Sequence, residues 1–144
     1  MAETRGDLAS SIGLLALRLG AGGLLLYGHG WGKLMHFSQR IGTFADPIGL
    51  GPAPSFVLVV FAEVVCSILV MLGFLTRLSV IPLIIFFAVA GFIQHAADPW
   101  AKRELAFVFA VPFVALLFTG PGRFSLDAKL GPWWPVGLGG RRQP

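Results

Sequence analysis

Charged residues are scarce in this chain of 144 residues, where Asp, Glu, Lys and Arg together make up only 12%. Soluble globular domains carry about 25% charged residues. With 56% hydrophobic residues and a mean hydropathy of +0.79, the composition therefore excludes an ordinary soluble domain. Cysteine is nearly absent too: Cys66 stands alone in an apolar stretch, which excludes an internal disulfide. We expect Cys66 to be a small core residue.

Several functional signatures are also missing. The Gly-rich segment 28–32 follows no predicted strand and ends an apolar helix, so a nucleotide-binding loop is not expected. We predict instead that its glycines at positions i and i+4 let another helix approach closely. The histidines lack metal-site spacing, because His29 and His36 would lie about 10 Å apart along a helix. The first apolar run is too long for a signal peptide and no Ala-x-Ala site follows it, so we expect it to be retained.

Four hydrophobic runs are long enough to cross a bilayer, which takes about 20 apolar residues in a helix. They cover about 11–33, 55–75, 78–95 and 99–119. The last one begins with Lys102, Arg103 and Glu104, so its apolar part is short. Short connections join antiparallel neighbours. We therefore predict a single all-α domain over residues 1–144, an antiparallel four-helix bundle that spans the membrane.

The longest connection lies between the first two spans and is broken by Gly and Pro. Apolar residues nevertheless recur there at helical spacing: Phe37, Ile41, Phe44 and Ile48. Two interpretations stay open. The first is a short amphipathic helix in the membrane interface, with Ser38 as its N-cap. The second is a plain surface loop.

The basic residues predict an orientation. Four spans place both termini on one side, where most of the 11 Lys and Arg residues fall: Arg5, Arg18, Arg77, Arg123, Lys129, Arg141 and Arg142. The positive-inside rule then puts both termini in the cytoplasm, with the chain in a bacterial inner membrane. Gly120-Pro121-Gly122 should end the fourth helix and open a cytoplasmic tail, 120–144. We expect Arg77 and Arg123 at the interface, and Trp133 and Trp134 as anchors there.

Ionisable residues stand inside these runs, although a charge at the bilayer centre costs roughly 2.5–3.5 kcal/mol. On the first helix, steps of three or four residues form one stripe: Arg18, Gly22, Leu25, His29, Lys33 and His36. We predict that Arg18, His29 and Glu63 point into the bundle. Glu63 would then need a partner, and the candidates are Arg18, Lys33 or a protonated His29. Alternatively the Glu63 carboxyl is itself protonated, or the pair only fixes helix packing.

The chain also predicts a titratable cluster from three helices at one depth, made of His29, Lys33, His95 and Glu104. The short turn after the third helix should bring His95 close to Glu104. Such a cluster could relay protons or donate hydrogen bonds to the headgroup of a quinone, with Trp31 and Phe92 as walls for the ring. Haem ligation by His29 or His95 is a lesser alternative.

Several segments form a recognisable combination: 17–20 (LRLG), 29–34 (HGWGKL), 73–78 (GFLTRL) and 119–127 (TGPGRFSLD), with Glu63 in the second helix. Together they resemble the DoxX-like family of small four-helix membrane proteins. The resemblance implies a four-helix membrane fold and a link to thiosulfate:quinone oxidoreduction. Related members are associated with oxidant defence and thiol redox. Since this chain has no Cys pair, we do not expect a dithiol mechanism within it.

Three functions remain open. We favour a membrane subunit of a redox complex that binds a quinone near His29, Lys33, Glu63 and His95. The alternatives are a non-catalytic subunit whose buried charges fix packing while it docks a larger complex, and a small proton-coupled carrier that uses Glu63. The expected partners are the lipid bilayer and either another protein or a second copy. The net charge of +4 falls mainly on loops and tails, which suits lipid headgroups and not nucleic acid.

Overall fold

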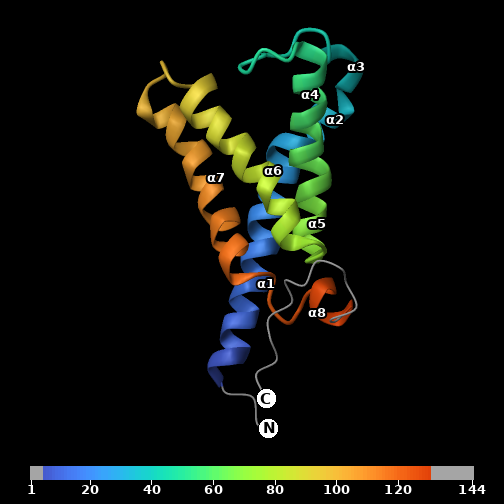
Figure 1. Cartoon of the computed structure of the whole chain (residues 1–144), viewed down its shortest axis with the longest axis vertical. Helices are drawn as coiled ribbons and strands as arrows, with labels where there is room; N and C mark the ends of the chain where they lie inside the picture. The colour runs from blue at the N-terminus through green and yellow to red at the C-terminus, as the bar shows by residue number, and fades with distance from the viewer. Residues whose placement is uncertain (1–4, 131–144) are drawn as a thin grey trace.

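The computed structural model describes residues 5–130, and every regular element in that range is helical (Figure 1). The first rod consists of α1 (Arg5–Leu25), η1 (Leu26–Gly30) and α2 (Trp31–Met35), and a single turn, α3 (Phe37–Arg40), follows it. The second rod consists of α4 (Pro52–Val60), η2 (Phe61–Cys66) and α5 (Ser67–Leu72). The third is α6 (Thr76–Val89) with η3 (Ala90–Gln94), and then come α7 (Trp100–Thr119) and α8 (Leu126–Leu130).

Three of these rods are long and apolar enough to cross a membrane: Asp7–Met35, Pro52–Leu72 and Thr76–Gln94. They coincide with the first three predicted spans to within a few residues. The helix α7 is also long, with 20 residues, but it carries Lys102, Arg103 and Glu104 near its start. The all-helical fold and three helices able to span a membrane are thus confirmed, whereas an antiparallel bundle of four spanning helices stays a prediction.

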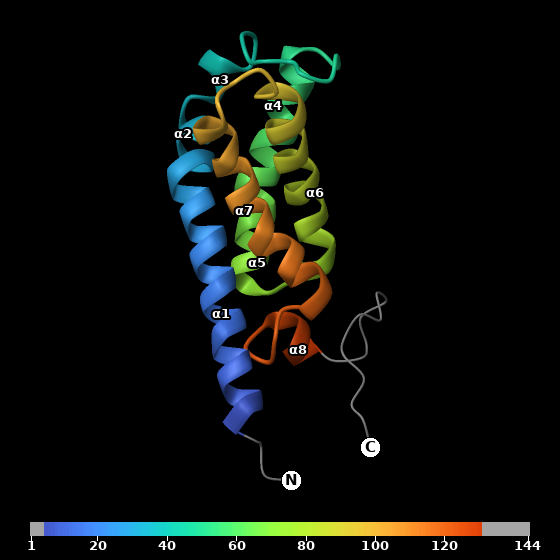
Figure 2. The same cartoon turned by 90° about the vertical axis from the view of Figure 1, so that its left-hand side faces the viewer.

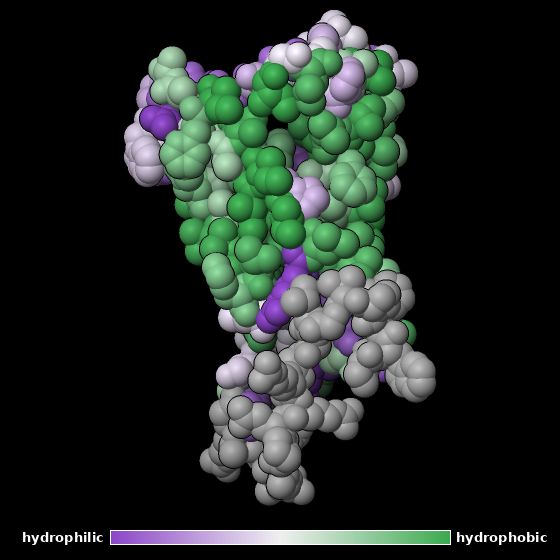
Figure 3. Space-filling model, viewed as in Figure 1, coloured by the Kyte–Doolittle hydropathy of each residue, from purple (hydrophilic) through white to green (hydrophobic). Residues whose placement is uncertain are grey.

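The long helices lie side by side and share one core (Figures 1 and 2). The rod of α6 packs along α7, while α1 packs against both α5 and α7. Buried aliphatic and aromatic side chains from the three rods and from α7 fill the space between them: Leu25, Val70, Leu83, Phe87, Phe113 and Leu116. Cys66 belongs to this core, as expected for a small apolar residue. Most of the coloured surface in the upper part of Figure 3 is apolar, as contact with lipid requires.

The fourth long helix ends where the sequence predicts. The last residue of α7 is Thr119, and Gly120 follows with a positive φ of 75°. Glycine has no Cβ and adopts this geometry without strain. Arg77 donates a hydrogen bond to the carbonyl of Phe118 at 3.2 Å, which satisfies one of the acceptors left open in the last turn of α7. Trp133 and Trp134 lie outside the described residues.

Of the two interpretations of the connection between the first two rods, the structure favours a loop and not an amphipathic helix. Only residues 37–40 form a helical turn there, and its N-cap is His36 without a side-chain cap, so Ser38 is not the cap. Phe37, Ile41 and Phe44 pack against a small core on α4 and η2. Their spacing therefore does not come from a continuous helix. It places apolar side chains of the irregular connecting segment, which we call the strap, against α4 and η2. Ile48 remains exposed.

Close approach of the first two rods depends on other glycines than those predicted. Gly28 and Gly32 have open space where a Cβ would be. Gly30, between them, faces the second rod: a Cβ there would lie 2.7 Å from the backbone oxygen of Glu63. A Cβ on Gly22 would lie 3.1 Å from the backbone oxygen of Ser67. Glycine at these two positions lets the rods come close enough for their polar residues to meet.

Candidate functional site

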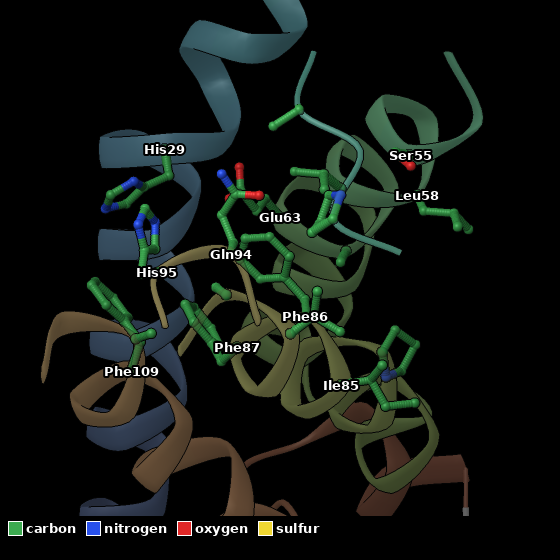
Figure 4. A pocket seen from close by; sticks show the side chains of 18 of the residues that line it. His29, Ser55, Leu58, Glu63, Ile85, Phe86, Phe87, Gln94, His95 and Phe109 are labelled. Carbon is green, nitrogen blue, oxygen red and sulfur yellow. The ribbon is translucent and has the colours of Figure 1, made fainter. Parts of the chain in front are cut away.

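π-Helical segments interrupt the first two candidate spans and end the third, and each of the three contributes a residue to one cavity. They are η1, η2 and η3, and η1 contacts η2 directly. Their polar residues are His29, Glu63 and Gln94, which all line the same cavity (Figure 4). π-Helical turns inside α-helices are rare and occur frequently at functional sites. No sequence pattern used above predicts them.

The centre of this region is an ion pair between the first two rods. The ammonium of Lys33 donates a hydrogen bond to Glu63 Oε2 at 2.6 Å. Glu63 is buried and Lys33 is mostly buried, so water screens the pair weakly. Of the three partners considered for Glu63, the structure therefore selects Lys33. His29 also lies close enough to interact electrostatically with the Glu63 carboxylate.

The face of the first rod follows the predicted stripe. Arg18, Gly22 and Leu25 are buried, and His29 and Lys33 are half-buried. The sixth member of the stripe, His36, is exposed. Its Nδ1 lies 2.9 Å from the carbonyl oxygen of Gly32. The predicted inward orientation of Arg18, His29 and Glu63 is thus confirmed.

The turn after the third rod carries a second polar group. His95 Nδ1 lies 2.6 Å from Asp98 Oδ2, and Lys102 Nζ lies 3.0 Å from the same oxygen. The hydrogen bond from His95, and then that from Lys102, lowers the pKa of Asp98. The predicted approach of His95 to Glu104 is wrong: Glu104 is exposed and makes no ion pair within residues 5–130. Asp98 comes first in the chain and satisfies His95 across the turn.

A cavity of about 620 Å³ lies beside these groups. Its volume is within the range of about 300–1,000 Å³ that small-molecule sites occupy. His29, Lys33, Glu63 and His95, the predicted site residues, all line it. Most of the remaining lining is apolar and comes from α4, η2, α6 and α7. Figure 3 shows a hollow in the upper part of the viewed face, with hydrophilic residues at its bottom.

Aromatic walls are present, but they differ from the predicted ones. Trp31 and Phe92 are 53% and 65% exposed and do not line the cavity. Phe86, Phe87 and Phe109 line it instead. Phe87 and Phe109 stack with ring centroids 5.5 Å apart. The rings of His29 and Phe109 lie nearly perpendicular to each other, with centroids 5.6 Å apart. The inward faces of α6 and α7 carry these rings, whereas Trp31 and Phe92 lie on the outer surface.

The strap between α3 and α4 closes one end of the cavity. Phe44, Ala45, Pro47 and Ile48 contribute to the lining. Asp46 fixes the strap by accepting hydrogen bonds from Gly51 N at 2.7 Å, Leu50 N at 2.9 Å and Ser55 Oγ at 2.7 Å. These bonds, first of all the one from Ser55, lower the pKa of Asp46. The sequence analysis missed Asp46, although an Asp before a Gly-rich turn is a known signal for such bonding.

Arg18 belongs to a different cluster at the opposite end of the bundle. Its fully buried guanidinium donates to the carbonyls of Met71 at 3.2 Å and Phe124 at 2.5 Å. Asp127 attracts it electrostatically and caps the start of α6 by accepting bonds from Leu75 N and Thr76 N. Arg18 is therefore no partner of Glu63: eleven residues of helix, about 16 Å, separate it from His29.

Metal binding finds no support in the described part of the chain, where no three His, Cys, Asp or Glu residues gather as ligands. The site's chemistry is instead that of hydrogen-bond donors and acceptors at the wall of an apolar cavity. An ammonium has three N–H donors, and the bond to Glu63 uses one of them. Imidazole can donate or accept a hydrogen bond.

Comparison with known proteins identifies the family of this chain. The family model described as DoxX matches residues 13–96. A relative from Mycobacterium tuberculosis, described as an uncharacterized membrane protein, is 33% identical, with 75% of this chain and 76% of the relative covered. No solved structure matches. The region that the family model matches, 13–96, includes Arg18, Lys33, Glu63 and His95 but ends before Asp98 and Asp127.

Proposed function

Since the chain belongs to the DoxX family and is an integral membrane protein, we propose that it binds a quinone-type headgroup and acts as a membrane subunit of a redox complex. The observation that carries the proposal is the Lys33–Glu63 pair in the wall of the cavity. An ion pair that only held helices together would not need an open space beside it.

The groups at the cavity wall suit both oxidation states of such a ligand. A quinone offers carbonyl oxygens, which can accept bonds from Lys33 and from an imidazole N–H of His29 or His95. A quinol offers hydroxyl groups, which can donate to the Glu63 carboxylate. The aromatic rings of Phe86, Phe87 and Phe109 would surround the flat ring with apolar contacts.

The proposal includes a topology. We place α7 across the membrane as a fourth span, because 20 residues of helix are about 30 Å long and match the hydrocarbon core. Its initial Lys102 and Arg103 would reach toward the headgroups. The start of α1 and α8 lie at one end of the bundle in Figure 1. We assign that end to the cytoplasm of a bacterial cell, because the larger share of basic residues falls there.

The test is extraction of the protein with a mild detergent, followed by quantification of co-purified quinone. We expect about one quinone for each chain, as one pre-formed site of this size would hold. His29→Gln and Lys33→Gln should reduce that amount while the protein still folds. His36→Gln is the matched control, because His36 lies on the same stripe but does not line the cavity. Unchanged quinone in both site variants, together with lower thermal stability, would favour a purely structural pair.

A further inference from the structure

Exposed residues line the cavity at several places, two of which we call its polar and its apolar opening. Its exposed lining residues include a polar group near the His95–Asp98 turn and an apolar group on the side of the bundle. The polar group contains Gln94 and Lys102. The apolar group contains Leu58 on α4 and Ile85 on α6, which are 51% and 58% exposed. In a membrane-spanning helix, an exposed apolar side chain faces lipid.

The apolar opening follows from how the second and third rods pack. The lower part of α6 packs against η2 and α5. Above it, α6 leans away from α4 together with α7 (Figure 1). The cavity lies in the space between them, and Pro82, Ile85 and Val89 line its α6 side. On the opposite side, the contact between His29 and Phe109 joins the first rod to α7.

The titratable residues labelled in the cavity lie apart from Leu58 and Ile85. Figure 4 shows His29 and His95 on one side, Glu63 near the centre, and Leu58 with Ile85 on the other side. A bound molecule would therefore have its hydrogen-bonding part toward His29 and Lys33. Its apolar part would point toward the gap between Leu58 and Ile85.

Building on the proposed quinone site, we infer that the ligand is a quinone with a hydrophobic tail, which enters from the bilayer between α4 and α6 and leaves its tail in that gap. The strap 44–48 then covers the end of the cavity and excludes water from the headgroup. The polar opening beside His95 and Lys102 connects the headgroup with the aqueous side. Leu58 and Ile85 would set which tails can pass.

Equilibrium binding in lipid nanodiscs tests this inference with two probes, a benzoquinone with a decyl tail and the same benzoquinone without a tail. Ile85→Trp should weaken binding of the tailed probe roughly tenfold, because an indole in the passage forces its neighbours to shift. The tail-less probe should bind as to the wild type. Ile81→Trp is the control: Ile81 is also exposed on α6, one turn earlier, but it does not line the cavity.

The outcomes separate the inference from the proposed function. If the wild type binds neither probe, the quinone site itself is wrong. If it binds both but Ile85→Trp acts like Ile81→Trp, or weakens both probes equally, the lateral passage is wrong and the quinone site stands. A decyl probe with a photoreactive diazirine at the end of its tail adds a second measurement on the unaltered protein. It should label peptides around Leu58 and Ile85, and labelling confined to the strap 44–48 would overturn the inference.

Discussion

The first rod holds two cations inside the bundle, Arg18 near its middle and Lys33 in its last turns, and the two have different surroundings. Arg18 is surrounded by backbone carbonyls and by the turn that Asp127 caps, and it does not line the cavity. Lys33 meets a single carboxylate, Glu63, and the cavity lies beside the pair. A charge within a membrane helix is costly at either place. The comparison teaches that the space beside a buried charge, and not the charge alone, separates a structural group from a candidate site.

Replacing Arg18 should have the largest effect on folding. Arg18→Met would leave the carbonyls of Met71 and Phe124 without their donor and would remove a buried guanidinium. We expect the free energy of unfolding to fall by about 4 kcal/mol. Thermal unfolding in detergent micelles measures this, and quinone binding by the fraction that remains folded should be unchanged. Loss of quinone binding with normal stability would show that Arg18 belongs to the binding site and would contradict its purely structural role.

Breaking the Lys33–Glu63 pair should cost somewhat less stability but remove binding. Lys33→Gln leaves a buried carboxylate without a cation, which should lower stability by about 3 kcal/mol. The double variant Lys33→Gln, Glu63→Gln should recover most of that loss, because two neutral amides can hydrogen-bond to each other. Glu63→Gln should likewise be tolerated better than Glu63→Leu. Additive losses in the double variant would indicate that the two side chains do not interact.

Removing the Asp127 cap should have a smaller effect. Asp127→Ala deprives Leu75 N and Thr76 N of their acceptor, and loss of a helix cap costs about 1–2 kcal/mol. The Asp127 carboxylate also attracts Arg18. Hydrogen exchange should therefore rise at the start of α6 and leave the strap 44–48 unaffected. Equal increases at both ends would contradict the separation of the two clusters.

The smallest expected effect is the pH dependence that Asp98 contributes. Hydrogen bonds from His95 and Lys102 lower the pKa of Asp98 in the folded protein. Its stabilising contribution is therefore present above the ordinary aspartate pKa and is lost as the pH falls through the lowered value. Thermal unfolding of wild type and Asp98→Asn, compared from about pH 6 to pH 2, should show a difference that shrinks as the pH falls below the ordinary aspartate pKa. A difference that grows toward low pH would reverse the sign and contradict the assignment.

Much of the helical layout could be predicted, because it depends on local properties of the sequence. Length and hydropathy locate the spans, and glycine after Thr119 ends α7. The stripe on the first helix follows from the helical period alone, so it correctly places Arg18, His29 and Lys33 on one face. Pairing of Lys33 with Glu63 was among the alternatives, since an intramembrane carboxylate needs a partner.

The remaining features depend on contacts between distant segments, which periodicity does not describe. Which aromatic rings line the cavity depends on how helices distant in sequence meet around it. The prediction of Trp31 and Phe92 as walls is therefore wrong, and Phe87 and Phe109 line the cavity instead. Asp127 acts on a helix start 51 residues earlier in the chain. His95 was paired with Glu104 because both flank one turn, whereas the geometry of that turn favours Asp98.

The central claim is that the cavity beside Lys33 and Glu63 binds a quinone-type headgroup. The most direct test is the affinity of the decyl-tailed benzoquinone for the protein in nanodiscs, measured for the wild type, for Lys33→Gln with Glu63→Gln, and for Asp127→Ala. The double variant should fold but lose binding, and Asp127→Ala should bind like the wild type despite its lower stability. Wild-type affinity in the double variant would contradict the claim.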